Sequence, residues 1–319
     1  MFKVAILDDY HHEALRLANW KPLDRDAQIQ VFSDNLQDAP RLAERLQSFD
    51  AVVVMRERTP FRRELFERLP NLRLLVTTGP RNASIDMAAA SERGVLVCGT
   101  QSTGFPTAEL TWGLIFALFR HLPQECQAMR EGKWICSTGR SVRGKTLGVV
   151  GVGRLGVDVV RVGNAFGMKV IAWSQNLTAE RAEAAGATLV TKQQLLEQSD
   201  IVTLHVVLSG RTRDLIGKAE FDRMKPTAVL VNTSRGPIVN EQALVEALRT
   251  KRIAGAAMDV YDQEPLPPYH PLRSLDNVVL TPHLGYATDD SFVLMWGEAV
   301  EDIRAFLDGA PIRIINKPA

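Results

Sequence analysis

The sequence predicts an α/β protein built from two doubly wound domains, and three observations lead to this expectation. Short apolar strands alternate with helices along most of the chain, which is typical of mostly parallel sheets covered on both faces. Residues 146–156 read TLGVVGVGRLG, in which an apolar strand runs directly into a G-x-G-x-x-G motif. The chain has 319 residues, more than one compact core usually spans.

The glycine motif comprises Gly151, Gly153 and Gly156. Such glycines allow a tight turn, a close approach of backbone to a pyrophosphate, and close packing of the next helix on the strand. A helix over 157–165, with its N-terminus toward an anion, and a strand over 168–173 are expected to follow. A lone G-x-G-x-x-G motif is weak evidence for a dinucleotide site. Here the motif stands between a predicted strand and a predicted helix, and a second strand follows, which favours a dinucleotide site over an ordinary glycine-rich turn.

Residues 1–100 are expected to form one α/β unit. Apolar runs predict strands over residues 3–7, 29–32, 51–55, 72–76 and 95–97. Helical spacing of apolar residues predicts helices over residues 11–19, 39–47, 61–69 and 85–92.

A strong helix is predicted over residues 107–120, with Thr107 as its cap. Its apolar residues occur nearly all round, so we expect it to be buried between domains or in a subunit interface. Residues 131–142 contain Gly, Trp and Ser without periodicity and are expected to form a loop.

The alternation resumes after residue 146. Further strands are predicted over residues 201–207, 228–232, 254–260 and 278–281. Further helices are predicted over residues 179–185, 193–198, 220–223, 241–250 and 288–307. Asn240 is expected to cap the helix over 241–250.

Composition and charge narrow the class of protein. The formal net charge is +1 and no basic run appears, so we expect neither nucleic acid nor another polyanion as a partner. The longest apolar stretch, residues 112–119, is too short to span a bilayer, and we expect a soluble protein without a membrane partner. The three cysteines lack metal-type spacing, which favours reduced thiols in a cytoplasm and no metal site.

Three polar residues follow predicted strands of the second domain: Arg235, Glu264 and His283. Ligands of open parallel sheets bind beyond the carboxyl ends of the strands. An arginine there can hold a substrate carboxylate, and a histidine can exchange a hydroxyl proton, with a carboxylate to orient the imidazole. Each residue alone is typical of an ordinary surface or loop position. Because all three follow strand ends of the same domain, we favour a shared catalytic site.

These residues lie in segments that resemble the D-isomer-specific 2-hydroxyacid dehydrogenase family. The matching segments are GVGRLG, HVVL from His205, MKPTAVLVNTSRG from residue 224, AMDVYDQEP from residue 257 and TPHLG from residue 281. The segments ASIDM at 83–87 and AELTW at 108–112 also match, so the resemblance runs from end to end.

The resemblance implies a role for each matching position. Arg235 would bind the substrate, Glu264 would be the carboxylate partner, and His283 the acid and base. Asp259 would contact the nicotinamide. The residues that the resemblance and the strand ends place around the cofactor are Gly151, Gly153, Arg154, Leu155, Gly156, Ser174, Gln175, His205, Val206, Thr233, Ser234 and Asp259.

In the first lobe the resemblance implies two substrate contacts. Gly79 falls where the family holds a substrate carboxylate with backbone N–H groups. Arg56, together with Arg58, matches a loop that faces the substrate, where two arginines could bind a second anionic group; a charged surface loop is the equal alternative.

The family architecture implies a Rossmann-type cofactor domain over residues 102–284, inserted into a flavodoxin-like catalytic domain of residues 1–101 and 285–319. The implied activity is hydride transfer between NAD(P)H and a 2-oxo acid or D-2-hydroxy acid, in a homodimer. A dinucleotide-sensing protein of the corepressor kind, without significant turnover, is the alternative, and a formate dehydrogenase is a weaker one.

The choice between NAD and NADP stays open. The residue that selects between them should lie about 20 positions after the glycines, where the chain reads Trp173-Ser174-Gln175-Asn176. No acidic residue stands there to hold a ribose 2′-hydroxyl. No arginine is adjacent either, unless Arg154 or Arg181 reaches the site.

Overall fold

The computed structural model describes residues 1–317 of the chain, which fall into two compact units. Unit 1 comprises residues 1–103 and the described residues from 287 onward. Unit 2 comprises Gly104–Tyr286. Each unit is an α/β domain with its own parallel sheet, as the alternation of strands and helices predicted.

Unit 1 contains a parallel sheet in the order β2-β1-β3-β4-β5, which is the flavodoxin-like order. Its strands are β1 (Phe2–Ile6), β2 (Ala27–Val31), β3 (Ala51–Val54), β4 (Leu74–Thr77) and β5 (Leu96–Gly99). Its helices are α1 (Ala14–Leu17), η1 (Lys21–Leu23), α2 (Ala39–Leu46), α3 (Arg63–Glu67), α4 (Met87–Glu92) and α12 (Asp289–Leu307).

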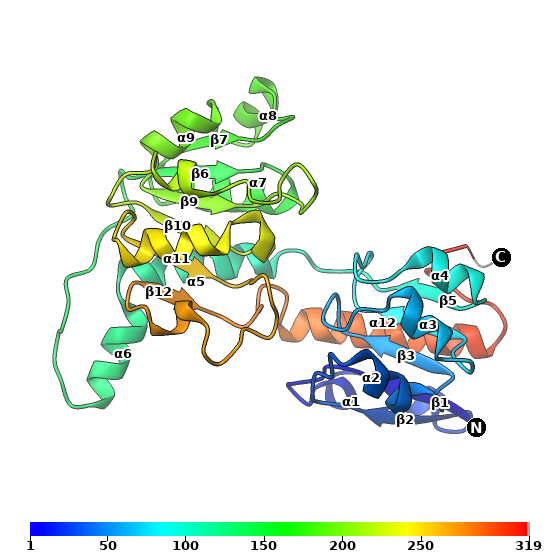
Figure 1. The fold of residues 1–319 in the computed structure, drawn as a ribbon. Coiled ribbons are helices and arrows are strands. Elements are labelled where there is room, and N and C mark those ends of the chain that lie inside the picture. Colours follow the sequence, from blue (N-terminus) through cyan, green and yellow to red (C-terminus); the bar gives the residue numbers. More distant parts are fainter. Residues whose placement is uncertain (318–319) are drawn as a thin grey trace. The chain divides into compact units, whose positions relative to one another are not determined.

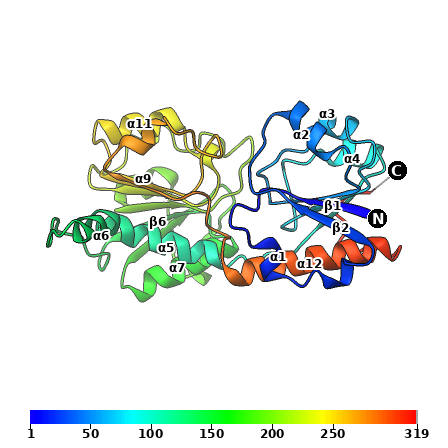
Figure 2. The same cartoon turned by 90° about the horizontal axis from the view of Figure 1, so that it is seen from below.

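Helices cover both faces of this sheet (Figures 1 and 2). α2, α3 and α4 lie on one face, and α1 and α12 lie on the other. The last helix, α12, returns to the first unit and buries a wide apolar face that includes Met295, Trp296 and Ile303.

Unit 2 contains a parallel sheet in the order β12-β11-β10-β9-β6-β7-β8. Its strands are β6 (Thr146–Val150), β7 (Lys169–Trp173), β8 (Thr188–Leu189), β9 (Ile201–Leu204), β10 (Val229–Asn232), β11 (Gly255–Met258) and β12 (Val278–Leu280). The strand order reverses between β6 and β9, and this reversal is the point at which doubly wound sheets bind ligands.

The helices of unit 2 also lie on both faces of its sheet (Figure 2). They are α5 (Pro106–Phe119), α6 (Leu122–Arg130), α7 (Arg154–Ala165), α8 (Ala179–Ala184), α9 (Lys192–Gln198), α10 (Lys218–Phe221), α11 (Glu241–Arg249), η2 (Gly236–Ile238) and η3 (Pro271–Ser274). Because side chains alternate along a strand, Leu147 and Val149 join the core under α5 and α7, whereas Val150 joins the core under α9 and α11.

Several local expectations need correction. α5 begins at Pro106, so Thr107 is not its cap but lies inside the first turn and donates its hydroxyl hydrogen bond to the Gly285 carbonyl at 2.7 Å. α6 was not predicted, because its sequence LPQECQAMR has no continuous apolar stripe. β9 ends at Leu204 rather than residue 207. Asn240 does cap α11, accepting from the Ala243 N–H at 2.9 Å.

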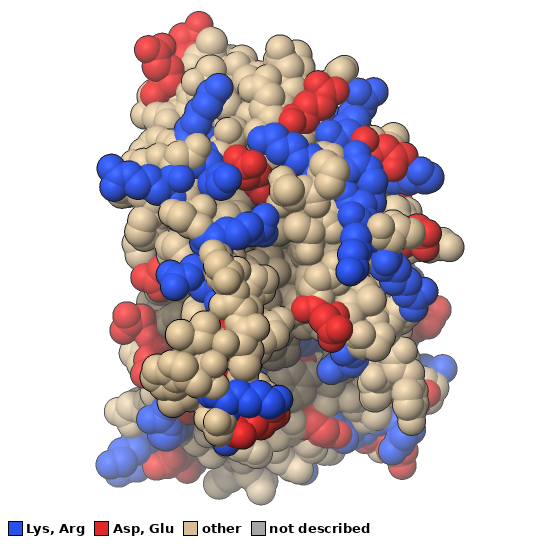
Figure 3. All heavy atoms as spheres, turned by 90° about the vertical axis from the view of Figure 1, so that its left-hand side faces the viewer, with Lys and Arg blue, Asp and Glu red and all other residues tan. Residues whose placement is uncertain are grey.

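The charge distribution on the surface, the apolarity of the helices and the grouping of possible metal ligands were each compared with the sequence-based expectations. On the face seen in Figure 3, basic and acidic side chains are interspersed with neutral ones, in keeping with the net charge of +1. Within residues 1–317, no helix has the length and apolarity that a membrane crossing requires. The described residues also contain no group of three or more His, Cys, Asp or Glu side chains arranged to hold a metal ion.

Candidate active site

The glycine turn between β6 and α7 is shaped by close backbone contacts. Gly151 has a φ of +97°, and a Cβ there would lie 2.7 Å from the His205 carbonyl oxygen. A Cβ on Gly156 would lie 2.1 Å from the Gly151 carbonyl oxygen. A Cβ on Gly153 would meet nothing within 4 Å, so this glycine leaves open space before the N-terminus of α7. The turn therefore fits a pyrophosphate held by backbone N–H groups.

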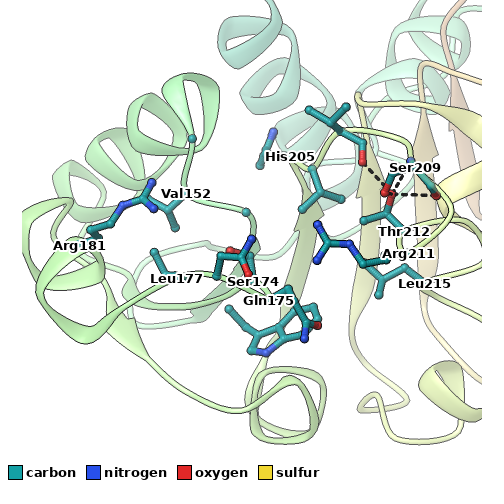
Figure 4. A pocket seen from close by; sticks show the side chains of 16 residues that line it. Val152, Ser174, Gln175, Leu177, Arg181, His205, Ser209, Arg211, Thr212 and Leu215 are labelled. Atoms are coloured by element: carbon teal, nitrogen blue, oxygen red, sulfur yellow. Dashed lines mark hydrogen bonds between the residues drawn. The ribbon is translucent and has the colours of Figure 1, made fainter. Parts of the chain in front are cut away.

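A cavity of about 400 Å³ lies at the switch point between β6, β7 and β9 (Figure 4). Its wall includes the glycine turn, the end of β7 and the loop that follows β9. Six of the predicted cofactor residues line it, namely Gly151, Gly153, Ser174, Gln175, His205 and Val206. The cavity therefore joins segments that are separated by more than fifty residues along the chain in a single ligand-sized space.

His205 contributes a neutral ring to this cavity. Burial lowers the pKa of its imidazole to about 4. Its Nε2 lies 2.9 Å from the Thr203 hydroxyl, whereas its buried Nδ1 has no hydrogen-bond partner among the described residues. The ring therefore adds no charge to the cavity wall.

Other predicted cofactor residues lie outside the cavity wall. The Arg154 guanidinium packs on Gly104, where a Cβ would lie 2.2 Å from Nη2, and Leu155 lies beside it in the first turn of α7. Thr233 and Ser234 follow β10, and their hydroxyls are engaged by the Thr111 hydroxyl at 2.8 Å and the Leu204 carbonyl at 2.7 Å. Their contact with a cofactor stays a prediction.

The centre of the candidate active site is a histidine and carboxylate pair at the ends of β12 and β11. His283 Nδ1 lies 2.6 Å from Glu264 Oε2, and Glu264 Oε1 accepts from the Tyr261 N–H at 3.0 Å. Because an ionised carboxylate can only accept, the Nδ1 atom carries the proton in this pair. The Nε2 atom of His283 is then the nitrogen that can exchange a proton with another molecule.

The charge state of Glu264 follows from two opposed effects. Burial raises the pKa of its carboxyl, but the hydrogen bond and charge of His283, with smaller contributions from the Tyr261 N–H and the Arg235 charge, outweigh it. The pKa therefore lies below its ordinary value, and the group is a carboxylate at neutral pH.

Asp259 fixes the segment that carries His283. Its Oδ1 accepts from the Thr281 hydroxyl at 2.6 Å and from the Leu284 N–H at 2.7 Å, and its Oδ2 accepts from the Gly285 N–H at 2.9 Å. Burial raises the pKa of this carboxyl. These bonds hold His283 in its left-handed backbone conformation, with a φ of +56°. The predicted contact of Asp259 with a nicotinamide stays a prediction.

Arg235 is brought to the same edge of the sheet by the turn after β10. The Asn232 side chain accepts from the Ser234 N–H and donates to the Arg235 carbonyl, both at 3.0 Å. A Cβ on Gly236 would lie 2.0 Å from the Tyr261 carbonyl carbon, so the two strand ends touch at backbone level. The Arg235 guanidinium donates to the Ser234 carbonyl at 2.8 Å, and its charge is one of the effects that lower the pKa of Glu264.

The two predicted substrate residues of unit 1 also lie together. Arg56 Nη1 lies 3.4 Å from the position that a Cβ on Gly79 would take. The backbone of Arg56 has a φ of +50° and is held by the Thr78 hydroxyl, which accepts its N–H at 3.0 Å. The Gly79 N–H donates to the Thr100 hydroxyl at 2.9 Å, so a substrate carboxylate here would meet the Arg56 guanidinium more readily than this N–H.

Arg58 differs from Arg56 in its surroundings. Its guanidinium donates to the Asp8 carbonyl at 3.2 Å and lies 4.7 Å from the centre of the Tyr10 ring. Arg56 in turn lies close to a carboxylate, with its Nε 3.9 Å from Glu57 Oε2.

Comparison with known proteins identifies the family. The sequence model of the D-isomer specific 2-hydroxyacid dehydrogenase, NAD binding domain, matches residues 112–285, which are more than half of the chain. The chain belongs to this family.

Relatives within the 2-hydroxyacid dehydrogenase family match along most or all of the chain. A D-3-phosphoglycerate dehydrogenase of Methanocaldococcus jannaschii is 34% identical over all of this chain and 60% of its own length. A glyoxylate reductase of Aeropyrum pernix is 39% identical over 80% of this chain and 79% of its own length. The crystal structure of a phosphoglycerate oxidoreductase from Vibrio cholerae O395 is 35% identical, with a TM-score of 0.93, and the match covers 97% of this chain and 100% of that one.

This member of the 2-hydroxyacid dehydrogenase family spans only part of some relatives. It covers 60% of the Methanocaldococcus jannaschii protein and 52% of a D-3-phosphoglycerate dehydrogenase from Archaeoglobus fulgidus, which is 38% identical over 275 residues.

Two residues of the candidate site were not predicted from the sequence. Arg211 lines the cavity from the loop after β9, and no local signal separates it from the neighbouring Arg213. Gly236 allows the close contact between the ends of β10 and β11. The glycine four residues after the predicted strand over 228–232 was the available signal for that close approach.

Proposed function

We propose that this protein transfers a hydride between a nicotinamide dinucleotide and a 2-oxo acid or D-2-hydroxy acid. The observation that carries the proposal is the pair of His283 and Glu264, 2.6 Å apart, at the edge of the sheet that also presents Arg235. In this proposal Gly104–Tyr286 is the dinucleotide-binding unit, and the rest of the described chain is the substrate unit. The enzymes named among its relatives favour this function over a dinucleotide sensor without turnover.

Each residue of the group has a distinct task in the proposed reaction. Arg235 would hold the substrate carboxylate by charge-assisted hydrogen bonds. His283 would donate its Nε2 proton to the carbonyl oxygen during reduction, or remove the hydroxyl proton during oxidation. Glu264 would keep Nδ1 protonated and stabilise the imidazolium form. The bound nicotinamide supplies the hydride chemistry.

The residues that would hold the dinucleotide are those of the glycine turn and the cavity. The open space at Gly153 and the N-terminus of α7 suit a pyrophosphate, and the neutral His205 ring suits an uncharged part of the ligand. Arg56 would bind an anionic group of the substrate from unit 1, close to Gly79.

An absorbance assay tests the proposed function. Oxidation of NADH and of NADPH is followed with glyoxylate, hydroxypyruvate, pyruvate, phenylpyruvate and phosphohydroxypyruvate. We expect turnover with at least one of these 2-oxo acids. Tight binding of a dinucleotide without turnover on any of them would favour a sensor.

We also propose that the protein is a homodimer that works in the cytoplasm. The cytoplasmic assignment is supported by Cys98, Cys126 and Cys136, which are free thiols, as a reducing compartment would keep them. The dimer is supported by large apolar side chains exposed on α6 and the segment that follows it. Met129 is 58% exposed, and Trp134 and Ile135 are each 76% exposed. Ile135 also has a φ of +48°, which is strained for a β-branched residue.

A second copy of the chain is the proposed occupant of this apolar surface, because a two-fold contact needs only one self-complementary patch. The double variant Trp134→Ser, Ile135→Ser should shift the mass in light scattering from dimer to monomer. Tyr269→Ser removes another large side chain, 98% exposed, and should leave the mass unchanged. An unchanged dimer in the double variant would exclude this surface as the interface.

A further inference from the structure

The end of β7 carries no acidic side chain to accept from the ribose 2′-hydroxyl. Dinucleotide sites that prefer NAD place an acidic side chain here, about 20 residues after the glycines, to accept from the 2′-hydroxyl. In this chain Ser174, Gln175 and Asn176 occupy the end of the strand and line the cavity. All three side chains are neutral, so nothing at this point repels a phosphate on the same ribose.

The same cavity contains two guanidinium groups. Arg181 lines it from α8, and Arg211 lines it from the loop after β9. Figure 4 shows the Arg211 side chain extending from that loop into the space between the loop and the end of β7. The two arginines come from different elements, more than twenty residues apart in the sequence.

Neither guanidinium is neutralised within the part of the chain that the structure describes. No ion pair or hydrogen bond of the Arg181 or Arg211 side chain occurs among residues 1–317, and no Asp or Glu is among the sixteen residues that line the cavity. Glu180 and Asp214, which lie close to them in the sequence, are not part of the wall. The cavity therefore has two positive charges with which an anionic ligand could pair.

The loop after β9 holds Arg211 in a defined position. The Ser209 N–H donates to the Thr212 hydroxyl at 2.8 Å, and that hydroxyl donates to the Val207 carbonyl at 2.7 Å. These bonds close a short turn with Arg211 at its tip. Thr212 and Ser209 also line the cavity, so the turn places Arg211 at the cavity wall, where a bound ligand can reach it.

We propose that the site is selective for a 2′-phosphorylated dinucleotide, NADP(H), with Arg211 as the main phosphate ligand and Arg181 as a second one. This inference rests on the proposed dinucleotide site. A 2′-phosphate accepts charge-assisted hydrogen bonds from a guanidinium fork, and an unphosphorylated ribose offers no such acceptor. Arg154, which packs on Gly104, has no part in this selectivity.

Isothermal titration calorimetry of the whole protein tests the proposal without relying on turnover. The probes are NADPH against NADH, and adenosine 2′,5′-bisphosphate against 5′-AMP, which differ only in the 2′-phosphate. We expect the phosphorylated member of each pair to bind about tenfold or more tightly at low salt. We also expect the preference to shrink as salt increases, because the arginines are exposed.

Four variants separate the contributions of the individual arginines to the preference. Arg211→Ala should reduce the preference for the 2′-phosphate about tenfold. Arg181→Ala should cause a smaller loss. Arg213→Ala removes the same charge from the same loop but from a residue outside the cavity wall, and should leave the preference unchanged. Arg211→Gln, which keeps the length of the side chain, is the second test if the alanine variant is unstable.

The binding results distinguish a failure of the NADP(H) proposal from a failure of the proposed function. Equal or tighter binding of NADH by the wild type, or a preference that survives Arg211→Ala and Arg211→Gln, would overturn the NADP(H) assignment and leave the proposed function in place. Failure of both dinucleotides to bind would instead remove the proposed function.

Discussion

Replacing His283 by asparagine is expected to reduce turnover by about 10²–10⁴-fold, the range typical for loss of a general acid and base. Asparagine tolerates the positive φ of this position and keeps a polar side chain, but it cannot carry a proton between the substrate and solvent. Steady-state rates and calorimetric binding of the dinucleotide are measured in parallel. We expect the rate to fall and the dinucleotide Kd to stay unchanged.

The chain offers a matched control for this variant. His270 Nε2 lies 2.9 Å from Glu241 Oε1, so a second histidine and carboxylate pair exists in the same unit. His270→Asn should leave turnover within about twofold of the wild type, because His270 caps η3 and the pair is not at the ends of β11 and β12. Normal reduction of a 2-oxo acid by His283→Asn would refute the proposed proton transfer.

Loss of the Arg235 guanidinium is expected to act mainly on the substrate. Arg235→Ala should lower kcat/KM by about tenfold to a hundredfold, mostly through a higher KM, because hydrogen bonds to charged groups contribute about 1.5–3 kcal/mol each. Arg235→Lys should recover only part of this loss, since an ammonium group cannot form the two parallel bonds of a guanidinium fork. The measurement is initial rate against 2-oxo acid concentration at saturating dinucleotide.

The control for Arg235 is an arginine of the same unit away from the strand ends. Arg223 forms an exposed ion pair with Glu197 at 3.3 Å, so Arg223→Ala should change kcat/KM very little. An unchanged KM in Arg235→Ala would show that the substrate carboxylate is bound elsewhere.

The order of most elements and the position of the His283 and Glu264 pair could be predicted from the sequence, because both follow from local patterns of strands and turns. The apolar run before Gly151 and the glycine spacing predict strand, turn and helix in order. The strand ends placed Glu264 and His283 at one edge of a parallel sheet, and the structure shows them hydrogen-bonded.

The remaining features depend on contacts that no local pattern encodes. Arg154 follows the glycine turn but packs on Gly104, a residue from a distant segment. Arg211 reaches the cavity only because its loop folds toward the end of β7. Thr107 has the composition of a helix cap, yet Pro106 starts the helix earlier and leaves the Thr107 hydroxyl to the Gly285 carbonyl.

The most direct test of the central claim follows the hydride itself. The wild-type protein is incubated with a reduced dinucleotide that carries deuterium at both C4 positions of the nicotinamide, together with a 2-oxo acid that gives a chiral product. Mass spectrometry and chiral chromatography should find one deuterium at C2 of the D-2-hydroxy acid, in equal amount to the dinucleotide oxidised. An L product, a product without deuterium, or no product despite tight dinucleotide binding would contradict the account.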